Sequence, residues 1–442
     1  MLRRSIHLSI SYLAFFLLTN SLQAQRLLTL EEAIATALQH NYDIILSKND
    51  SAVAALDYSY RNAIFLPRLN GNIGTVWNNN DTKQILFDGS VREKDGLKSN
   101  NINASLALNW TLFDGLKMFA TKDKAAELVK LGELGIKDQV INTVATVINT
   151  YFDIVRQKQQ LKAVEESMSI SQTRVDLSQR RLEIGVGAKP DVLQSKVDLN
   201  AQKAAQLRQL TLIQQLKETL NQTMNVTPNS TYDVVDSIPI NTAILLNDIQ
   251  NNIENSNTTL QILKKNIDIA NLTLKERRAE RFPIVSFNSA YNFNRLKNQT
   301  VINSFSTLFN RNKGFNYGLT ATIPILNNRN THRLIKQAEL DIQYQRLIFD
   351  NQRTLVNLGV INAFRDYELQ KQALELEESN ILLAKENVSI ILETYRLGQA
   401  TYLQLREAQK SLEDAYNRLI AARYNTKLAE TELLRLKGDL VK

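Results

Sequence analysis

The sequence lacks cysteine, is poor in proline and glycine, and has no long apolar run beyond its first residues. Without cysteine the chain has no disulfide, no thiolate metal site and no lipid-modified cysteine. Only 14 residues are glycine and 6 are proline, and these are the residues that interrupt helices. After the N-terminus no stretch offers the ~20 apolar residues of a transmembrane helix. The sequence therefore predicts long uninterrupted helices, and any membrane contact has to be made by strands.

The first 24 residues have the features of an export signal. Arg3 and Arg4 form a basic start, Ile6 to Leu18 is mostly apolar, and Leu22-Gln23-Ala24 ends on a small residue. The apolar stretch is too short to span a bilayer as a helix, so cleavage is predicted, with a buried N-terminal helix as the alternative. Loss of the two arginines lowers the formal charge from +8 to +6. The charges are interleaved along predicted helices, which indicates solvated faces and no nucleic-acid partner.

The chain repeats itself once. A shift of 213 residues places Ile184 to Gly187 on Leu397 to Ala400. The same shift superimposes an apolar ladder with a spacing of seven: Val140, Val147, Ile154, Leu161, Met168, Val175 and Leu182 in the first half, and Val360, Tyr367, Leu374, Ile381, Val388 and Tyr395 in the second. Only the first position fails, because Val140 falls on Arg353. A sustained seven-residue repeat predicts a coiled coil. Shorter bundle helices bent at Gly132, Gly135 and Gly359 are the alternative.

Each half is predicted to contain a helix, a strand pair and a long helical hairpin. A helix of ~70 residues would be ~105 Å long, which no compact domain holds. The predicted segments are a signal peptide at 1–24, a first repeat at 25–224, a linker at 225–245 and a second repeat at 246–442. The first repeat contains a helix at Leu30 to Phe65, strands at 68–78 and 101–112 and a hairpin at 114–224. The second contains a helix at Leu246 to Arg281, strands at 284–294 and 315–325 and a hairpin at 330–437.

The strand segments alternate with a period of two. Apolar residues such as Ile102, Leu106 and Trp110 alternate with Asn101, Ser105 and Asn109, and the segments after Pro283 follow the same pattern. Their length of about 10 residues matches a tilted membrane strand, and an Asn-rich uncharged face suits a wet lumen. The polar stretches Asn78 to Asn100 and Arg295 to Gly314 are predicted to be long external loops. Open sheet edges cannot face lipid, so the chain is expected to oligomerise; three copies would give twelve strands.

The order of these features resembles one known family. The signal peptide, Leu28-Thr29-Leu30-Glu31-Glu32-Ala33, the two similar halves, Leu112-Phe113-Asp114-Gly115 after a strand hairpin, and the two glycine-containing tips are similar to the TolC-type outer-membrane efflux family. The resemblance covers essentially the whole mature chain and depends on order and spacing rather than on any single motif.

The resemblance implies an α+β membrane protein that forms a homotrimer. Such a trimer has a 12-strand β-barrel, with four strands per chain, continuous with a long antiparallel α-helical coiled-coil tunnel across the periplasm. It implies a passive exit duct of a tripartite efflux or type I secretion system, located in the cell outer membrane. The implied partners are a periplasmic adaptor (membrane fusion protein), an inner-membrane transporter of RND or ABC type, and outer-membrane lipid.

The resemblance also assigns functional positions. The two tips, Gly185-Val186-Gly187-Ala188-Lys189 and Gly398-Gln399-Ala400-Thr401, are expected to dock the adaptor. The gate is expected to use Tyr395 and Asp191, while the arginine position of the family's lock falls on Ala400. The acidic ring that narrows such pores maps to Gln404 and Glu407, which leaves one carboxylate per chain instead of two. The residues themselves allow simpler interpretations: the tips are only turns, Asp191 caps a helix, and Tyr395 is a coiled-coil core residue.

No catalytic, metal or cofactor-binding constellation competes with a channel. The three histidines, His7, His40 and His332, are scattered, and HExxH, P-loop and dinucleotide motifs are absent. The sequence therefore predicts no enzyme and no cofactor. Two rival functions stay open: the same fold serving metal-ion efflux or protein secretion, and a periplasmic coiled-coil scaffold or adaptor without a barrel. With four Met and three His, small amphiphilic cargo is favoured over metal ions.

Overall fold

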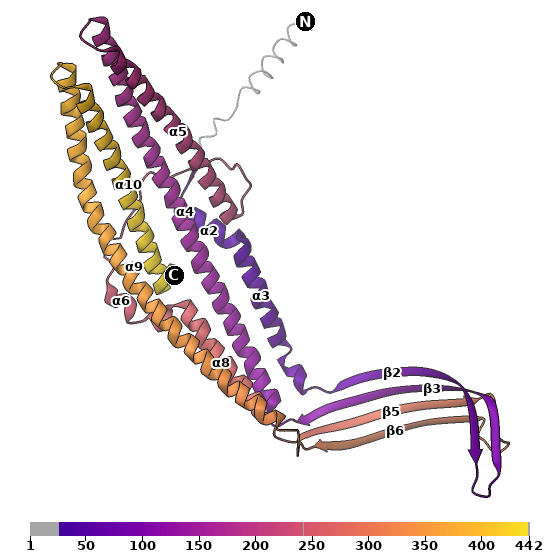
Figure 1. Ribbon diagram of the computed structural model, residues 1–442. Coiled ribbons are helices and arrows are strands. Elements are labelled where there is room, and N and C mark those ends of the chain that lie inside the picture. Colours follow the sequence, from indigo (N-terminus) through magenta and orange to yellow (C-terminus); the bar gives the residue numbers. More distant parts are fainter. Residues whose placement is uncertain (1–25, 242, 441–442) are drawn as a thin grey trace, which may run out of the picture. The chain divides into compact units, whose positions relative to one another are not determined.

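The structure, a computed structural model, describes residues 26–241 and 243–440 (Figure 1). The predicted signal peptide, residues 1–24, lies outside the described residues. The chain is mostly helical with a few strands. In chain order the elements are β1 (Arg26–Leu28), α2 (Leu30–His40), α3 (Tyr42–Ser59), the 3₁₀ helix η1 (Arg61–Phe65), β2 (Arg68–Ile85), β3 (Val91–Phe113), α4 (Lys117–Glu183), α5 (Lys189–Met224), β4 (Tyr232–Val234), α6 (Leu246–Gln250), α7 (Ile253–Ser256), α8 (Thr258–Ala279), β5 (Ile284–Asn298), β6 (Phe309–Thr322), α9 (Asn330–Arg396) and α10 (Tyr402–Lys437).

The chain divides into two compact units. The hairpin unit contains the described residues up to Ser47, then Ile136–Thr259, and the described residues from Gln352. The sheet unit contains Lys48–Gly135 and Leu260–Asn351. Helices α4 and α9 contribute residues to both units, whereas all four long strands belong to the sheet unit.

The two long helices predicted from the sequence are present, and each is a single helix of 67 residues. Asp114 begins the first by accepting a hydrogen bond from the backbone N–H of Met118 at 3.0 Å. Helix α4 continues through Gly132, where a Cβ would lie 3.1 Å from the Cα of Ser51, so glycine lets α3 approach closely. Helix α9 likewise continues through Gly359. The alternative of shorter helices broken at glycines is therefore wrong.

The shorter helix predicted at the start of each half is interrupted, which corrects the sequence prediction. Leu30 to Phe65 divides into α2, α3 and η1 because Asn41 is the C-cap of α2, while its side-chain Oδ1 accepts the N–H groups of Asp43 and Ile44 and starts α3. An asparagine that both ends and begins a helix is a local competition that apolar periodicity does not report. Leu246 to Arg281 similarly divides into α6, α7 and α8.

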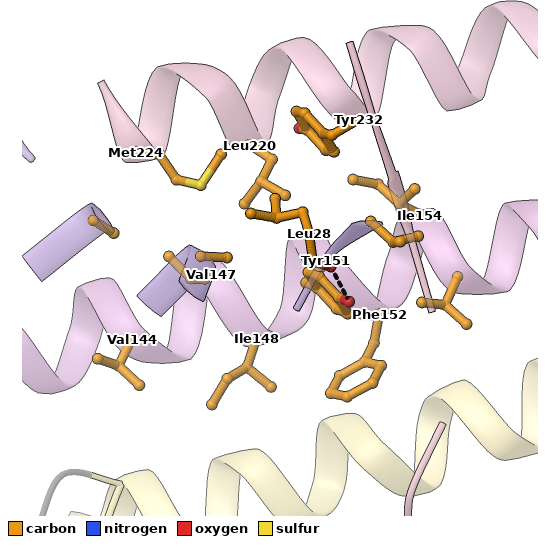
Figure 2. Close-up of a cluster of buried hydrophobic side chains, with 14 of the residues drawn as sticks. Leu28, Val144, Val147, Ile148, Tyr151, Phe152, Ile154, Leu220, Met224 and Tyr232 are labelled. Atoms are coloured by element: carbon orange, nitrogen blue, oxygen red, sulfur yellow. Dashed lines mark hydrogen bonds between the residues drawn. The ribbon is translucent and has the colours of Figure 1, made fainter. Parts of the chain in front are cut away.

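The seven-residue ladder is the buried seam of the hairpin unit. Val147, Ile154, Val360 and Tyr367 are each 0% exposed, and no described ladder residue is classed as exposed. Figure 2 shows the core of the first half. In it the ladder residues Val147 and Ile154 belong to the same apolar cluster as Leu28 of β1, Met224 of α5 and Tyr232 of β4. There the hydroxyl of Tyr151 donates to the carbonyl of Leu28 at 2.7 Å. The periodicity therefore identified the coiled-coil core correctly.

A two-stranded parallel sheet ties the linker to the start of the chain. Strand β1 pairs with β4, with Leu28 opposite Val234. Lys158 of α4 holds the linker by ion pairs to Asp233 at 2.9 Å and Asp236 at 2.7 Å. In the second half Tyr367 fulfils a role like that of Tyr151, since its hydroxyl donates to Asn241 O at 2.6 Å.

The sheet unit contains a four-stranded antiparallel sheet in the order β2-β3-β5-β6. One face carries Leu69, Ile73, Leu106, Trp110, Phe287, Tyr291, Phe293, Phe315, Tyr317 and Leu319. The other carries Asn70, Asn72, Asn103, Ser105, Asn109, Asn288, Asn292, Asn294, Asn316 and Thr320. Amide side chains join across the polar face, with Asn109 to Asn288 at 2.5 Å and Asn294 to Asn103 at 2.6 Å. The predicted alternation therefore gives two chemically distinct faces.

The strands are longer than predicted: the predicted loop Asn78 to Asn100 is mostly strand, and about half of the predicted loop Arg295 to Gly314 is strand. Strands β2 and β3 continue to Ile85 and from Val91, where cross-strand contacts such as Lys83 with Glu93 at 2.6 Å extend the hairpin. Strand β5 runs to Asn298 and β6 starts at Phe309. Polar side chains misled the loop prediction, because a strand with both faces in water need not alternate in polarity. Among the described residues, no helix is long and apolar enough to cross a membrane.

Candidate functional site at the two hairpin tips

Both helical hairpins reverse through the same backbone turn. In the first, Gly185 has φ of 79° and donates to Leu182 O, while Val186 donates to Arg181 O at 2.9 Å. In the second, Gly398 has φ of 77° and Gln399 donates to Thr394 O at 2.9 Å. These are Schellman ends, in which glycine supplies the left-handed residue. The glycines predicted at the tips are therefore required by the backbone.

The second tip starts its returning helix with a capping box. The hydroxyl of Thr401 accepts the N–H of Gln404 at 3.3 Å, and the side-chain oxygen of Gln404 accepts the N–H of Thr401 at 2.8 Å. This accounts for Gln404 by local structure, since the box satisfies two otherwise unpaired backbone donors. The first tip has no such cap: Ala188 is the N-cap of α5 and Pro190 lies in its first turn.

Tyr395 lies buried between the two hairpins, at 3% exposure. Its hydroxyl is 3.2 Å from the hydroxyl of Ser178, which in turn is 3.4 Å from that of Ser195. The guanidinium of Arg181 lies 4.9 Å from the centre of the tyrosine ring and donates to Tyr395 O at 3.4 Å. The Tyr395 ring is therefore part of the buried coiled-coil core, and its hydroxyl is also a polar contact between α9 and α4.

Asp191 lies in the first turn of α5 and lines the same cavity as Tyr395. This cavity of about 350 Å³ lies between the tips, and Arg181, Gly398 and Thr401 also line it. The hydrogen bonds of the described residues include none between Asp191 and Tyr395; the backbone carbonyl of Asp191 accepts from Ser195 at 2.7 Å. The two predicted gate residues are thus neighbours across a cavity, and Arg181 stands beside them although the sequence assigned the arginine position to Ala400.

A half-buried carboxylate that the sequence analysis did not identify connects three helices near the tips. Asp198 of α5 accepts from Arg174 of α4 at 2.6 Å and from the hydroxyl of Tyr402 of α10 at 3.1 Å. Arg406, also on α10, lies 3.6 Å from the same oxygen. The Arg174 side chain is 2% exposed and that of Asp198 17%. We refer to Arg174, Asp198, Tyr402 and Arg406 as the Asp198 cluster.

The Asp198 cluster left a weak signal in the sequence. Ser171, Arg174 and Ser178 are polar residues at helical spacing on α4, beside the ladder residue Val175. All three are buried. Burial also raises the pKa of the Tyr402 hydroxyl, so the phenol stays a neutral hydrogen-bond donor. A buried charge is tolerated only when it is paired. Here the pair joins α4 to α5 within the first hairpin, and Tyr402 and Arg406 of α10 connect its carboxylate to the second hairpin.

Glu407 is exposed on α10, and its carboxylate makes none of the hydrogen bonds or ion pairs found among the described residues. It stands five residues beyond Tyr402, where the returning helix starts. Gln404 and Glu407 are both exposed, but the Gln404 side chain is engaged in its capping box whereas the Glu407 carboxylate stays available to solvent.

Comparisons with known proteins match this architecture. The sequence matches the family described as Outer membrane efflux protein over residues 33–226 and 249–439. It is 20% identical to the outer membrane protein TolC of Salmonella enteritidis over 80% of this chain and 72% of that protein. It is 22% identical to the TolC protein of Vibrio cholerae serotype O1 over 90% of this chain and 87% of that protein. The crystal structure of the outer membrane protein VceC from Vibrio cholerae superimposes with a TM-score of 0.76 at 15% identity, covering 92% of this chain and 96% of VceC.

The fold and the matched segments therefore define a channel protein of bacterial efflux. The chain belongs to the outer membrane efflux protein family, and it is an outer-membrane efflux duct protein. The resemblance inferred from the sequence is confirmed.

Proposed function

We propose that three copies of the chain form the duct, with their sheets closed into one twelve-strand barrel in the outer membrane. The observation that carries this proposal is the sheet itself, which has an apolar aromatic face, an asparagine face and two unpaired edges, on β2 and β6. In lipid, unpaired backbone groups at a sheet edge cost several kcal/mol each. Pairing β6 of one copy with β2 of the next would satisfy them and place the asparagines in a wet lumen.

The chain arose, on this proposal, by duplication of one unit that contained helices, a strand pair and a helical hairpin. The same side-chain contacts in both halves support this. Asn41 donates to Thr223 O at 2.8 Å in the first half, and Asn257 donates to Leu436 O at 3.0 Å in the second. Tyr151 and Tyr367, both 0% exposed, each donate from the hydroxyl to a backbone carbonyl outside the hairpin, Leu28 O of β1 and Asn241 O respectively.

The proposed duct is passive and ends at the hairpin tips. There it meets a periplasmic adaptor of the membrane fusion type, which links it to an inner-membrane transporter of RND or ABC type. The two Schellman turns support this docking role because their glycines, Gly185 and Gly398, are exposed and a Cβ at either would meet no atom within 4 Å, so an adaptor can approach the backbone closely. Ala400 of the second tip is buried instead. The proposed cargo is small and amphiphilic. The proposal also includes export by a cleaved signal peptide at residues 1–24. It divides the mature chain into repeats at 25–224 and 246–442, joined by a linker at 225–245.

The proposed gate consists of Asp191 and Tyr395 around the tip cavity, reinforced by the Asp198 cluster. Hydrogen bonds connect the second hairpin to the first, among them that of Tyr395 with Ser178 and that of Tyr402 with Asp198. Loss of these bonds would allow the second hairpin to move outward. Glu407 is proposed to be the one remaining carboxylate per chain at the constriction, because clefts lined with one sign of charge concentrate counter-ions. Gln404 is proposed to lie at the same constriction as an uncharged residue, with its side chain engaged in the capping box.

The oligomer and the barrel are tested together with two adjacent substitutions. Leu106 lies on the apolar face and is paired with Tyr291, whereas Ser105 lies on the asparagine face and is paired with Asn292. A lysine on the lipid face near mid-membrane costs about 2–4 kcal/mol. Leu106→Lys should therefore abolish insertion and trimer formation, and Ser105→Lys should leave both intact.

The readouts are outer-membrane fractionation and native mass measurement in mild detergent. The wild-type protein should appear in the outer-membrane fraction as three copies. A stable wild-type monomer, or equal tolerance of both lysines, would refute the proposed barrel. Recovery of the wild-type chain from the soluble periplasmic fraction would favour the scaffold alternative instead.

A further inference from the structure

A cluster of five unpaired cations lies on the apolar face of the sheet, at the end remote from α4. Strand pairing places Lys98, Arg295, Lys297, Arg311 and Lys313 on the same face as the apolar residues, because Arg295 is directly opposite Arg311 and Phe293 is directly opposite Lys313. We refer to these five residues as the basic collar. Among the described residues, the side-chain nitrogens of the collar make no ion pair or hydrogen bond.

Strands β5 and β6, which carry four of the five collar residues, supply no counter-charge. From Ile284 to Thr322 there is no aspartate or glutamate, and 97–113 contains none either. Like charges placed directly opposite each other on neighbouring strands destabilise the pair, which describes Arg295 and Arg311. The Nε atom of Arg295 is moreover buried without a partner. An arrangement of repelling, unsatisfied cations indicates an anionic ligand that is not part of the chain.

The position of the collar indicates which ligand this is. Trp110 and Phe287 lie at the α4 end of the apolar face, and Trp77 and Phe309 lie level with Lys297 at the other end. Aromatic residues at two levels mark the two interfaces of a membrane. From Phe287 to Arg295 the strand rises about 27 Å, or about 20 Å along the membrane normal at the usual tilt. The collar therefore stands where lipid headgroups begin.

The surface beside the collar also fits an amphiphile. A hollow of about 620 Å³ has Ile73, Trp77 and Ile102 on its apolar side and Arg295 and Lys297 on its charged side. A headgroup phosphate beside the arginines would leave its acyl chains against the apolar face. Arginine is especially suited to such contacts, since its planar guanidinium can bind phosphate through two parallel hydrogen bonds.

We propose that the basic collar binds the phosphate groups of an anionic lipid of the outer leaflet, with the lipid chains packed on the apolar face. This inference depends on the proposed barrel, which directs this end of the sheet outward. Its ligand is a phosphorylated lipid headgroup, and binding would both neutralise the collar and fix the depth of the barrel in the membrane.

The test uses the full-length protein in mild detergent, titrated with bisphosphorylated lipid A and read by native mass measurement. We expect saturable binding that is lost when the lipid's phosphates are removed and that equimolar inorganic phosphate does not displace. The variant Arg295→Gln/Lys297→Gln/Arg311→Gln should bind about a hundredfold more weakly, since each cation near an anionic lipid surface contributes about fivefold.

The matched control removes three cations from the distal part of the neighbouring β2–β3 hairpin, with Lys83→Gln/Arg92→Gln/Lys94→Gln. Lys83 pairs with Glu93 and Lys94 donates to Val301 O at 2.8 Å, so neither belongs to the collar. This control should bind as the wild type does. Equal weakening in both variants, unchanged binding in the collar variant, equal binding of phosphate-free lipid, or displacement by inorganic phosphate would each overturn the lipid site.

A parallel measurement separates this inference from the proposed function. Trimer mass and single-channel conductance in planar bilayers are recorded for the wild type and both variants. A conducting trimer without phosphate-dependent lipid binding refutes the basic collar as a lipid site and leaves the duct standing. A wild-type protein that forms no trimer and no channel refutes the proposed barrel itself.

Discussion

Removal of the Asp198 carboxylate should both destabilise the hairpin unit and loosen its tips. Asp198→Ala leaves Arg174 as an uncompensated charge in a site where that side chain is 2% exposed. Breaking a buried ion pair from one side costs about 3–5 kcal/mol, because the remaining charge stays desolvated. The partial contact of Arg174 with the Tyr402 ring, 5.3 Å from its centre, recovers only a little of this. We therefore expect Asp198→Ala to lower the free energy of unfolding by an amount in the upper part of the range usual for single substitutions.

The assay is thermal and denaturant unfolding of the detergent-purified protein, with a double-mutant cycle. Arg174→Met should be less harmful than Asp198→Ala, and the double variant Arg174→Met/Asp198→Leu should be close to the wild type, since apolar replacement of a whole buried pair is often neutral. The control is Glu393→Ala, which breaks the exposed ion pair with Arg396 at 2.6 Å near the same tip. That change should cost about 0–1 kcal/mol.

The same cluster predicts a specific effect on opening. Tyr402→Phe removes the hydroxyl that bonds the Asp198 carboxylate and also contacts Ser195. The bond to Asp198 is worth about 1.5–3 kcal/mol because the acceptor is charged. If this bond exists only in the closed state, the open population should rise about ten- to a hundredfold. Conductance in planar bilayers measures it. The reasoning is refuted if Asp198→Ala costs no more stability than Glu393→Ala, or if Tyr402→Phe leaves the open probability unchanged.

Three further predictions concern the tips and the helices. The double variant Gly185→Val/Gly398→Val should abolish efflux while insertion and trimer formation persist. A Cβ at either position meets no atom within 4 Å, so the cost to stability is the strain of positive φ, about 1–2 kcal/mol each. Efflux that survives both changes excludes adaptor docking there. Glu407→Ala should lower the cation selectivity of the channel in planar bilayers, and unchanged selectivity would place the constriction elsewhere. Burial raises the pKa of Tyr424 to about 12, so its neutral phenol contributes stability below pH ~10 that is lost as the pH rises through about 12. Tyr424→Phe should therefore flatten the dependence of the free energy of unfolding on pH over that range. An unaltered dependence would show that this tyrosine is not the titrating group.

Much of the helical architecture could be predicted from the sequence because a seven-residue period is a local property that directly reports a buried stripe. The two hairpins end at Met224 and Lys437 as predicted, since the left-handed residues Asn225 and Gly438 fix those helix ends through backbone geometry. The strand segments were located for the same reason, as alternation reports two faces. Their extension past Asn78 was missed because pairing in water requires no alternation.

Only the tertiary structure decided where the first helix breaks and how the two hairpins are joined. At Asn41 the side chain can continue a helix or cap one, and its contact with Thr223 O selects the cap. Arg174 and Asp198 are read from sequence as solvated charges, and Tyr402 as an ordinary helix residue. Arg174 and Asp198 lie 24 positions apart and Tyr402 lies 204 positions from Asp198, and a single polar contact leaves no period in the sequence. Apolar patterns thus determine which faces are buried, whereas the match of individual charges across those faces exists only after the chain has folded.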